Sequence, residues 1–518
     1  MEEILFTILK YIGISVGLYL AYLVYQLLVF PYMYWKTFQK YPNVYTTQKF
    51  IPFLGDVKDA LDDHKAGRAF YSHRIKQAAP LKDYDMKVRI EGQMPLIMLH
   101  SNQAIEEFCK LQPHKIDRFD PKKGLNKLGK DTFLFKRSTK QTLKRKKLLT
   151  SFLSLNSSSR HIPCMVKFTK EVLESLGEGT THDFVDVTNI ISFNIFTSVL
   201  FGADMIALAE KKRSYKMPGG AVDHISLREF SIRLFKAHYA HLFHPLTITL
   251  KFLMTYNLVN PFKRDRENYL TYMEAMKELY LNCTEKESIC QQILDRTDFT
   301  EFEKINDLNA FILAGAETSS HAMVSTLFFL KKYPRTLQKL MKEFEDNGIT
   351  KQFVESQTLT KEIVESLDYL ACVVKEALRM DNPASEPFNY FAVEDVNICG
   401  VPFPKGTIFR KDINAGHYSP NYWKDPYEFV PERFDVESEF FQEASKEGKI
   451  GAGYSKRSFS HGTRACPGQS FAVLEIKVVL IVVLTHIGYT VDDALLDKEG
   501  VGFGIGSECI PSFKVTKL

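Results

Sequence analysis

The loop from Phe459 to Gly468 constrains this chain more than any other segment, because it fixes one cysteine between glycines and close to an arginine. Its sequence is Phe-Ser-His-Gly-Thr-Arg-Ala-Cys-Pro-Gly, with Cys466 two residues before the last glycine. Gly462 and Gly468 can adopt positive φ and let the backbone approach a flat ligand. Phe459 can shield the sulfur, and Arg464 can pair with a carboxylate. The loop predicts a flat, anionic ligand bound through a thiolate; a structural cysteine beside a turn is the alternative.

A second motif, Ala314-Gly-Ala-Glu-Thr-Ser319, lies within a segment that predicts a long helix. Ala314 and Gly315 remove bulk, and Glu317 places an acid beside the hydroxyl of Thr318. A threonine hydroxyl can bond back to an upstream carbonyl and bend the helix, which opens a gap for water. The pair is therefore suited to passing protons. An ordinary contact between small residues of two helices is the alternative when this hexapeptide is taken alone.

Two further motifs supply one carboxylate and two guanidinium groups. Glu376 and Arg379 lie three residues apart on one face of a predicted helix, and Pro431-Glu-Arg-Phe434 downstream supplies Arg433. Exposed pairs of this kind contribute under about 1 kcal/mol. A buried Glu376–Arg379–Arg433 network would instead stiffen the scaffold through bidentate contacts, so we assign these three residues a structural role.

In order and spacing, these motifs resemble those of the cytochrome P450 family, whose cysteine loop is Phe-x-x-Gly-x-Arg-x-Cys-x-Gly. The resemblance covers roughly residues 50 to 515. It implies haem b (iron protoporphyrin IX) between a long central helix and the cysteine loop, with Cys466 as the axial ligand of the iron. Phe459, Gly462, Arg464, Gly468, Ala314 and Gly315 would then line the haem. Glu317 and Thr318 would deliver protons during oxygen activation.

One segment departs from the family pattern. The family's Trp-x-x-x-Arg, which binds haem propionates, aligns with Thr142-x-x-x-Lys146, and the chain's two tryptophans lie elsewhere. No Lys or Arg stands between Arg379 and Lys405, where many members place another propionate partner. The alignment leaves Arg464 as the main partner, with Arg145 or Lys146 as the second.

The segment from Lys136 to Lys147 is rich in lysine and arginine. The resemblance places it on the side of the cysteine loop, together with Lys456 and Arg457, where an NADPH-dependent flavoprotein reductase can dock through long-range attraction. Cytochrome b5 is a further candidate partner. A solvated helix face is the alternative. The net charge of +5 is too small to imply a nucleic-acid partner.

The segment from Tyr11 to Phe30 is almost wholly apolar and long enough to cross a bilayer as a helix of about 30 Å. Acidic residues precede it, unlike a cleaved signal peptide. Lysines follow it, so the remainder is expected on the cytosolic side of a membrane, by default the endoplasmic reticulum. The eight cysteines form no C-x-x-C pair, which argues against a disulfide framework or a zinc site.

The organisation predicted is an anchor at residues 1–30, a connector at 31–49 and one catalytic domain at 50–518. The expected fold class is mainly α with small β-sheets. Predicted helices span Asp307–Lys332, Thr360–Met380 and Gln469–His486; predicted strands span Met86–Ile90, Leu96–His100, Val396–Ile398 and Ile408–Lys411.

These features together predict a membrane-anchored haem-thiolate monooxygenase that inserts one oxygen atom of O2 into a lipophilic substrate, with electrons from NADPH through a reductase. The apolar stretch from Phe230 to Phe262 would roof the pocket. Two alternatives remain. One is a family member that isomerises or dehydrates a peroxide, although retention of Glu317 and Thr318 argues against it. The other is a non-catalytic, membrane-tethered haem-binding protein.

Overall fold

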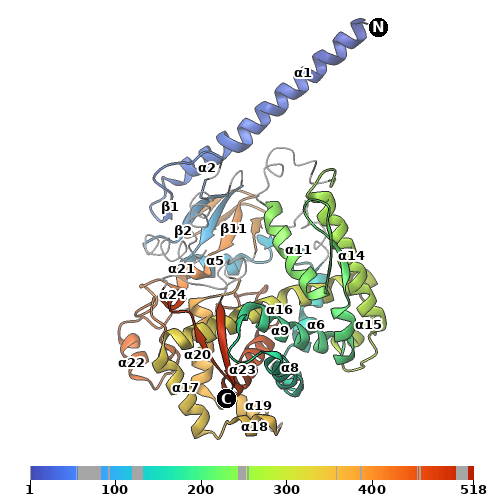
Figure 1. Cartoon of the computed structure of the whole chain (residues 1–518). Helices are drawn as coiled ribbons and strands as arrows, with labels where there is room; N and C mark the ends of the chain where they lie inside the picture. The colour runs from blue at the N-terminus through green and yellow to red at the C-terminus, as the bar shows by residue number, and fades with distance from the viewer. Residues whose placement is uncertain are drawn as a thin grey trace.

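A helical region and a smaller sheet region form the body of the protein, and a long amino-terminal helix projects from it (Figure 1). The computed structural model describes residues 2–53, 55–56, 83–91, 94–118, 132–242, 253, 256–356, 359–384, 388–451, 453, 457–497 and 511–517. Helices predominate and the sheets are small, so the predicted fold class is confirmed.

The helical region is built around α16 (Glu301–Lys332), which packs against α9 (Phe184–Phe201), α20 (Asp368–Met380) and α23 (Gln469–His486). A capping box between Thr300 and Glu303 starts α16, since each side chain bonds the other's backbone N–H. Helices α9 and α23 are long and apolar enough to cross a membrane, but most of each is buried in the body. An apolar surface on all sides is typical of such buried helices.

The other helices surround this core. They are α5 (Asn102–Leu111), α6 (Lys140–Phe152), α7 (Leu155–Ser159), α8 (Ile162–Ser175), α10 (Ile206–Glu210), α11 (Leu227–Leu242), α14 (Phe262–Asn282), α15 (Ile289–Leu294), α17 (Pro334–Asp346), α18 (Lys351–Glu355), α19 (Lys361–Glu365), α21 (Ile413–His417), α22 (Glu439–Lys446) and α24 (Asp493–Leu496). Short 3-10 turns span Ala203–Met205 and Pro431–Phe434.

The largest sheet has the strand order β1-β2-β3-β11-β8-β4. Its strands are β1 (Val44–Tyr45), β2 (Met86–Glu91), β3 (Met94–Leu99), β4 (Ile116–Arg118), β8 (Tyr390–Ala392) and β11 (Ile408–Lys411). Strands β4 and β8 are antiparallel and set Arg118 opposite Tyr390, whereas β11 runs parallel to β3. This register brings the ends of β4 and β11 to either side of Tyr390.

Three smaller sheets complete the fold. They pair β9 (Val396–Ile398) with β10 (Val401–Phe403), β6 (Arg213–Lys216) with β7 (Val222–Ile225), and β13 (Ser512–Lys517) with both β5 (Thr181–Asp183) and β12 (Ile487–Val491). The apolar core accordingly has two parts, one among the helices and one around the six-stranded sheet.

The predicted elements are largely confirmed. Helix α23 has the expected ends, and the four predicted strands are present with shifts of up to two residues at their ends. Helix α16 begins earlier than predicted, at the capping box. The helix expected over Thr360–Met380 is instead two helices, α19 and α20, because the chain leaves helical geometry at Leu367, whose ψ is 84°.

The amino-terminal helix continues beyond residue 30. Helix α1 (Glu2–Val24) passes through a π-helical turn at Tyr25–Val29 into α2 (Phe30–Phe38). The span Glu3–Phe38 qualifies as a membrane crossing, and its most apolar stretch has no residue buried in the body. The first part of the predicted connector is therefore helical. Its last residue, Phe38, is buried and stacks on Phe403 at 5.4 Å between ring centroids.

Candidate functional site

The cysteine loop is a tight turn that leads into α23. The backbone N–H of Cys466 donates to the carbonyl of Phe459 at 3.0 Å, and that of Ala465 donates to the carbonyl of Gly462. Gly462 has a φ of +83°, as expected for a position that favours glycine. Gly468 does not: its φ is −94°, and it occupies the position just before α23. The prediction of positive φ holds for Gly462 and is wrong for Gly468.

The sulfur of Cys466 is exposed, although it lies among buried elements. Burial raises the pKa of the thiol, while the N–H of Gly468 and the charge of Lys146 lower it. Phe459 is half-buried against the helical core. The side chain of Cys466 is therefore accessible, while the protein around it disfavours the charged thiolate.

Helix α16 presents a small exposed residue in its otherwise buried middle: Ala314. The next residue, Gly315, has a different role from the one predicted. A Cβ at this position would lie 2.3 Å from Cζ of Phe196 on α9. The ring of Phe196 also packs 4.9 Å from that of Phe471, in the first turn of α23. Gly315 therefore makes room for Phe196, which holds the middle of α16 beside the start of α23.

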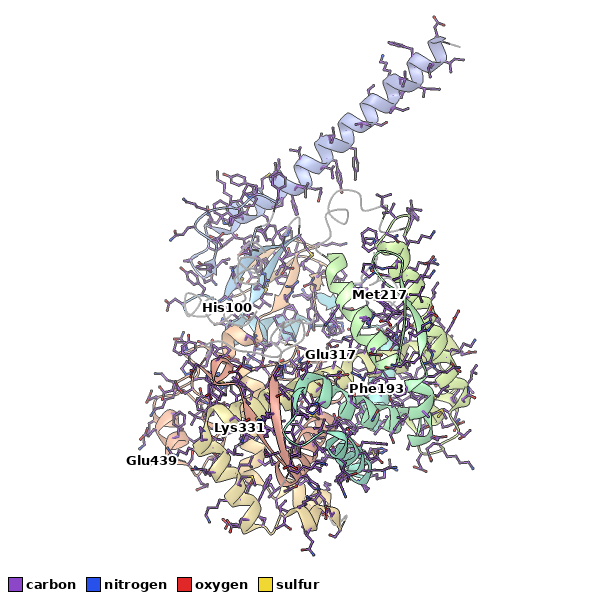
Figure 2. All side chains as sticks on the ribbon, in the orientation of Figure 1. His100, Phe193, Met217, Glu317, Lys331 and Glu439 are labelled. Carbon is purple, nitrogen blue, oxygen red and sulfur yellow. The ribbon has the colours of Figure 1, made fainter. Side chains whose placement is uncertain are left out.

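The acid and the alcohol lie on the same stretch of α16, and both are half-buried. The hydroxyl of Thr318 donates to the carbonyl of Ala314 at 2.7 Å. Glu317, in the middle of the body (Figure 2), has an oxygen 3.9 Å from Nε2 of His321. The carboxylate of Glu317 and the back-bonded hydroxyl of Thr318 thus stand one and two residues after the small residues Ala314 to Ala316.

Two of the predicted cationic side chains lie at the cysteine loop, one within it and one on a neighbouring helix. Arg464 is buried, and its Nη2 donates to the carbonyls of Phe133, Leu134 and Lys136, whereas Nη1 has no hydrogen-bond partner among the described residues. Lys146 on α6 donates from Nζ to the carbonyl of Thr463 at 2.8 Å. Burial lowers the pKa of Lys146 to about 8, and the charge of Arg464 adds to this effect.

Two further cationic side chains near the cysteine loop were not predicted from the sequence. Arg118, at the end of β4, is 4% exposed and lies over the rings of Phe388 and Tyr390, 3.6 Å and 4.7 Å from their centroids. Its Nε and Nη1 have no hydrogen-bond partner within the described part of the chain. Lys411, at the end of β11, donates to the hydroxyl of Ser460 at 2.6 Å. Both residues are far from Cys466 in sequence, so no spacing pattern could reveal them.

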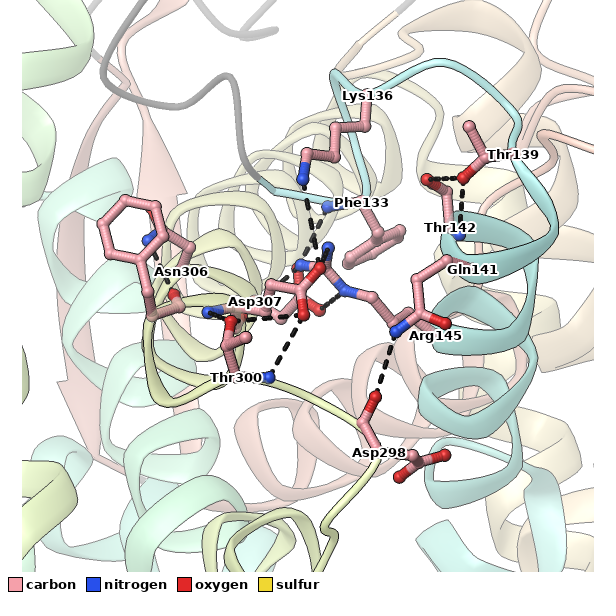
Figure 3. Close-up of polar contacts among 12 residues, drawn as sticks. Phe133, Lys136, Thr139, Gln141, Thr142, Arg145, Asp298, Thr300, Asn306 and Asp307 are labelled. Carbon is pink, nitrogen blue, oxygen red and sulfur yellow. Dashed lines mark hydrogen bonds and ion pairs between the residues drawn. The ribbon is translucent and has the colours of Figure 1, made fainter.

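Arg145, the other predicted propionate partner, is engaged elsewhere. Its Nε and Nη2 bind the two carboxylate oxygens of Asp307 at 2.7 and 2.6 Å, and its Nη1 binds Glu303 at 3.0 Å (Figure 3). The guanidinium thus joins α6 to the first turns of α16. This engagement with two carboxylates contradicts the expectation for Arg145, whereas Lys146, the other candidate on α6, reaches the cysteine loop. Thr142, at the place of the family's tryptophan, is buried against its N-cap neighbour Thr139.

The four cations form a positively charged cluster around Tyr390, defined by Arg118, Lys146, Lys411 and Arg464. Burial raises the pKa of Tyr390, but the charges of Arg118, Lys411 and Arg464 outweigh it, so the pKa falls below its ordinary value. Burial also lowers the pKa of Arg118 to about 10. Buried cations with unpaired nitrogens are costly without a counter-charge. A flat group that has two carboxylates and takes an axial thiolate fits this set of donors, and haem is such a group.

The structure also brings together Glu376, Arg379 and Arg433. Arg379 binds both oxygens of Glu376 at 2.7 and 2.9 Å, and Arg433 binds one of them at 2.8 Å. All three side chains are buried. The remaining guanidinium donors reach carbonyls of His417, Lys424, Asp425, Pro426 and Glu428. The network therefore fixes the irregular segment between α21 and α22.

The basic segment is partly neutralised. Lys136 lies 3.9 Å from Glu303, Lys144 lies 2.8 Å from Asp298, and Arg137 lies 3.8 Å from Asp117. Lys140 and Lys147 are exposed. Arg457 is 2% exposed and so contributes little to a docking surface, and Lys456 lies outside the described residues.

Comparison with known proteins agrees with this site. The family model of Cytochrome P450 matches residues 84–496. Human "Cytochrome P450 3A5" is 26% identical over 423 residues, which are 77% of this chain and 78% of the human protein. "Cytochrome P450 3A15" of Cavia porcellus is 29% identical over 45% of each chain. The Citrus sinensis "(1S)-1-hydroxy-luvungin A synthase CYP88A37" is 34% identical over 36% of this chain and 35% of its own.

The matched residues, 84–496, include the acid–alcohol helix, the buried carboxylate network, the cysteine loop and all four clustered cations. A haem-thiolate site, electron supply from a redox partner and the insertion of an oxygen atom from O2 are the properties that this family implies. The chain therefore belongs to the cytochrome P450 family of oxidoreductases.

Proposed function

We propose that this chain is a membrane-anchored monooxygenase that inserts one oxygen atom of O2 into a lipophilic organic substrate, with electrons from NADPH supplied through a flavoprotein reductase. The observation that carries the proposal is Cys466, which is exposed yet desolvated and lies on the loop that the positively charged cluster contacts. Neither peroxide isomerisation nor simple haem storage requires the acid and alcohol on α16, which this chain retains.

The proposed cofactor is haem b, which the thiolate of Cys466 would hold. When bound, it supplies the oxygen activation, which an electron-rich thiolate assists. Arg118 and Arg464 have nitrogens without a hydrogen-bond partner among the described residues, and these nitrogens would bind its propionates. Lys146 and Lys411 would add positive charge beside them. Phe459 shields the sulfur, and Gly462 permits the turn that presents it. Ala314, small and exposed on α16, would leave room beside the group.

Glu317 and Thr318 move protons at the open middle of α16. Thr318 holds its hydroxyl proton on the carbonyl of Ala314, which leaves the hydroxyl oxygen free to accept another donor. Glu317, half-buried and next in sequence, can exchange protons with solvent at the opening and with that hydroxyl. Together they provide a path from water to the site, while the surrounding apolar helices exclude bulk solvent.

The reductase is proposed to dock beside α6, on the segment from Lys136 to Lys147. The exposed Lys140 and Lys147 supply most of the free charge, since several of their neighbours are already paired with acidic residues. Long-range attraction of an acidic partner to such a face raises the rate of association and weakens with salt. Cytochrome b5 is the second candidate for the same face.

Residues 1–30 are proposed to anchor the protein in the endoplasmic reticulum membrane, residues 31–49 to connect, and residues 50–518 to form the catalytic domain on the cytosolic side. A bilayer concentrates lipophilic molecules, which agrees with the proposed substrate class. Residues 243–252 and 254–255 of the predicted pocket roof lie outside the described residues.

The first test is the carbon monoxide difference spectrum of the reduced, purified protein and of Cys466→Ala. We expect a strongly red-shifted Soret band that the variant loses. A histidine-type spectrum, or no bound haem, would contradict the thiolate assignment. The second test is NADPH consumption with a flavoprotein reductase: a peroxide isomerase would consume none, and a storage protein would form no oxidised product from any lipophilic compound tested.

A further inference from the structure

One turn beyond the acid–alcohol pair, α16 carries a histidine that faces the acid. Nε2 of His321 lies 3.9 Å from Oε1 of Glu317. Residues four apart lie on one face of a helix, and helical side chains lean toward its amino end. The imidazole of His321 therefore lies over the turn that carries Glu317, and a small rotation of the carboxylate brings the two atoms to hydrogen-bond distance.

The two partners differ in their surroundings. His321 is 7% exposed, whereas Glu317 is half-buried at the open side of the helix. Nδ1 of His321 has no hydrogen-bond partner among the described residues. Leaving a buried polar atom unpaired costs about 1–3 kcal/mol, so packing alone does not favour an imidazole here.

The backbone at His321 is fixed from the other side. The hydroxyl of Ser325, one turn further, lies 2.9 Å from the carbonyl of His321 and 2.5 Å from a carboxylate oxygen of Asp381, which is 1% exposed. This contact ties α16 to the end of α20. The turn that carries the imidazole is thus tied to α20, while the carboxylate that it faces is half-buried.

We propose that His321 is a positioning residue that acts through Glu317. Its Nε2–H donates to Oε1 of Glu317 and holds the carboxylate along the helix, beside the hydroxyl of Thr318, rather than extended into the open space. The proposal rests on the proton-delivery role given above to Glu317 and Thr318. His321 itself contacts neither substrate nor cofactor in this role.

The test uses the full-length, haem-loaded chain with an NADPH-dependent flavoprotein reductase and no added substrate. It measures hydrogen peroxide released per NADPH consumed, which rises when protons are delivered poorly. Because an i,i+4 contact contributes only tenths of a kcal/mol, His321→Leu is expected to raise this ratio about two- to threefold. His321→Gln keeps a donor at the same reach and is expected to restore the ratio.

Two comparisons separate this role from general damage. In a Glu317→Gln background, His321→Leu is expected to add nothing, because the carboxylate it positions is gone. His486→Leu makes the same substitution at a buried histidine at the far end of α23 and is expected to leave the ratio unchanged. A ratio unaffected by His321→Leu, a Gln variant that behaves like the Leu variant, or an equal effect in the Glu317→Gln background would each overturn the proposal.

A readout without turnover completes the test. The second measurement is an NMR spectrum of the reduced, carbon monoxide-bound protein labelled with 13C at histidine Cε1. The His321 resonance is assigned as the one that the His321→Gln variant lacks, and it is expected to shift in the Glu317→Gln variant. An unmoved resonance contradicts the contact. If Glu317→Gln and Thr318→Ala leave the peroxide ratio unchanged, the proposed relay itself fails; if they raise it and His321→Leu does not, only the positioning role fails.

Discussion

Single side chains at the cysteine loop show how distant parts of the chain supply one site. Cys466 and Arg464 come from the loop, Lys146 from α6, and Arg118 and Lys411 from the ends of two strands. The two strand residues lie on either side of Tyr390 because β4 and β11 are placed by their pairing with β8. Sheet register therefore determines where two of the four clustered charges lie.

Arg118 provides the first prediction at this scale. Arg118→Gln removes a buried charge whose Nε and Nη1 have no hydrogen-bond partner among the described residues. If these nitrogens bind a propionate, the variant loses a charged hydrogen bond of about 1.5–3 kcal/mol, and haem dissociates about tenfold to a hundredfold faster. The measurement is haem transfer to apomyoglobin. Arg137→Gln, at an exposed residue near the same strand, is the control and should leave the rate unchanged.

Glu475 provides the second prediction, which concerns how the free energy of unfolding depends on pH. Burial raises the pKa of this carboxyl to about 8 from 4.5, although the hydroxyls of Ser319 and Ser192 partly oppose the shift. The folded state thus keeps a proton that the unfolded state releases above about pH 4.5. Raising the pH favours the unfolded state across that window, by about 1.4 kcal/mol per pH unit, until the folded carboxyl also ionises near pH 8.

Glu475→Gln removes this titration. The variant's free energy of unfolding should rise relative to that of the unmodified protein between pH 5 and pH 8, and the difference should stay constant above pH 8. Urea unfolding at several pH values measures it. Glu365→Gln serves as the control. It changes a more exposed carboxyl of α19 that pairs with Lys477, which lies on α23 together with Glu475. Parallel pH profiles for Glu475→Gln and the unmodified chain would refute the prediction.

Sequence reasoning found the residues that share a motif and missed those that do not. The cysteine loop and the acid–alcohol pair each have a local pattern, so Cys466, Arg464, Glu317 and Thr318 were visible. Arg145 was misassigned because adjacent basic residues on one helix point in different directions, and only the buried Asp307 shows which way its guanidinium lies. Nothing local marks Arg118 or Lys411, since sheet pairing alone brings them to the loop.

At the scale of helices, the contact between α9 and α16 depends on one missing side chain. Gly315→Ala would normally stabilise a helix by about 1 kcal/mol. Here the new Cβ meets the ring of Phe196 at 2.3 Å, so we expect destabilisation by about 1–3 kcal/mol. Thermal unfolding measures it, and Phe196→Leu in the same chain should recover part of the loss. A stabilised Gly315→Ala variant would show that Phe196 does not fill this space.

Helix ends were the least predictable part of the fold. The start of α16 was placed too late, although Thr300 and Glu303 have the spacing of a capping box. The break between α19 and α20 has no glycine or proline to mark it; tertiary packing places Leu367, which is fully buried, between the two helices. Helix α23 was predicted in full, because a glycine precedes it and a largely apolar run extends to its last turn.

For the molecule as a whole, the connection between the amino-terminal helix and the body determines how the site sits relative to a membrane. Phe38 is buried against Phe403, the indole of Trp35 donates to the carbonyl of Thr47, and the amide of Asn43 binds Asp85 and the carbonyl of Cys399. Residues after about 34 are therefore part of the folded body, although the helix itself is continuous from Glu2 to Phe38.

Two deletions of different length separate anchoring from folding. Removing residues 2–29 should release the protein from membranes, measured by sedimentation with liposomes. It should leave the thermal unfolding midpoint nearly unchanged, because Leu27 is the one residue of that stretch that the structure describes as buried. Removing residues 2–43 should also release it but lower the midpoint by several degrees, since it exposes Phe403 and leaves Asp85 without the amide of Asn43. Phe38→Ala in the full chain should reproduce part of that fall and keep membrane binding. If both deletions unfold alike, α2 contributes nothing to the body, and the anchor ends at Phe38 instead of residue 30.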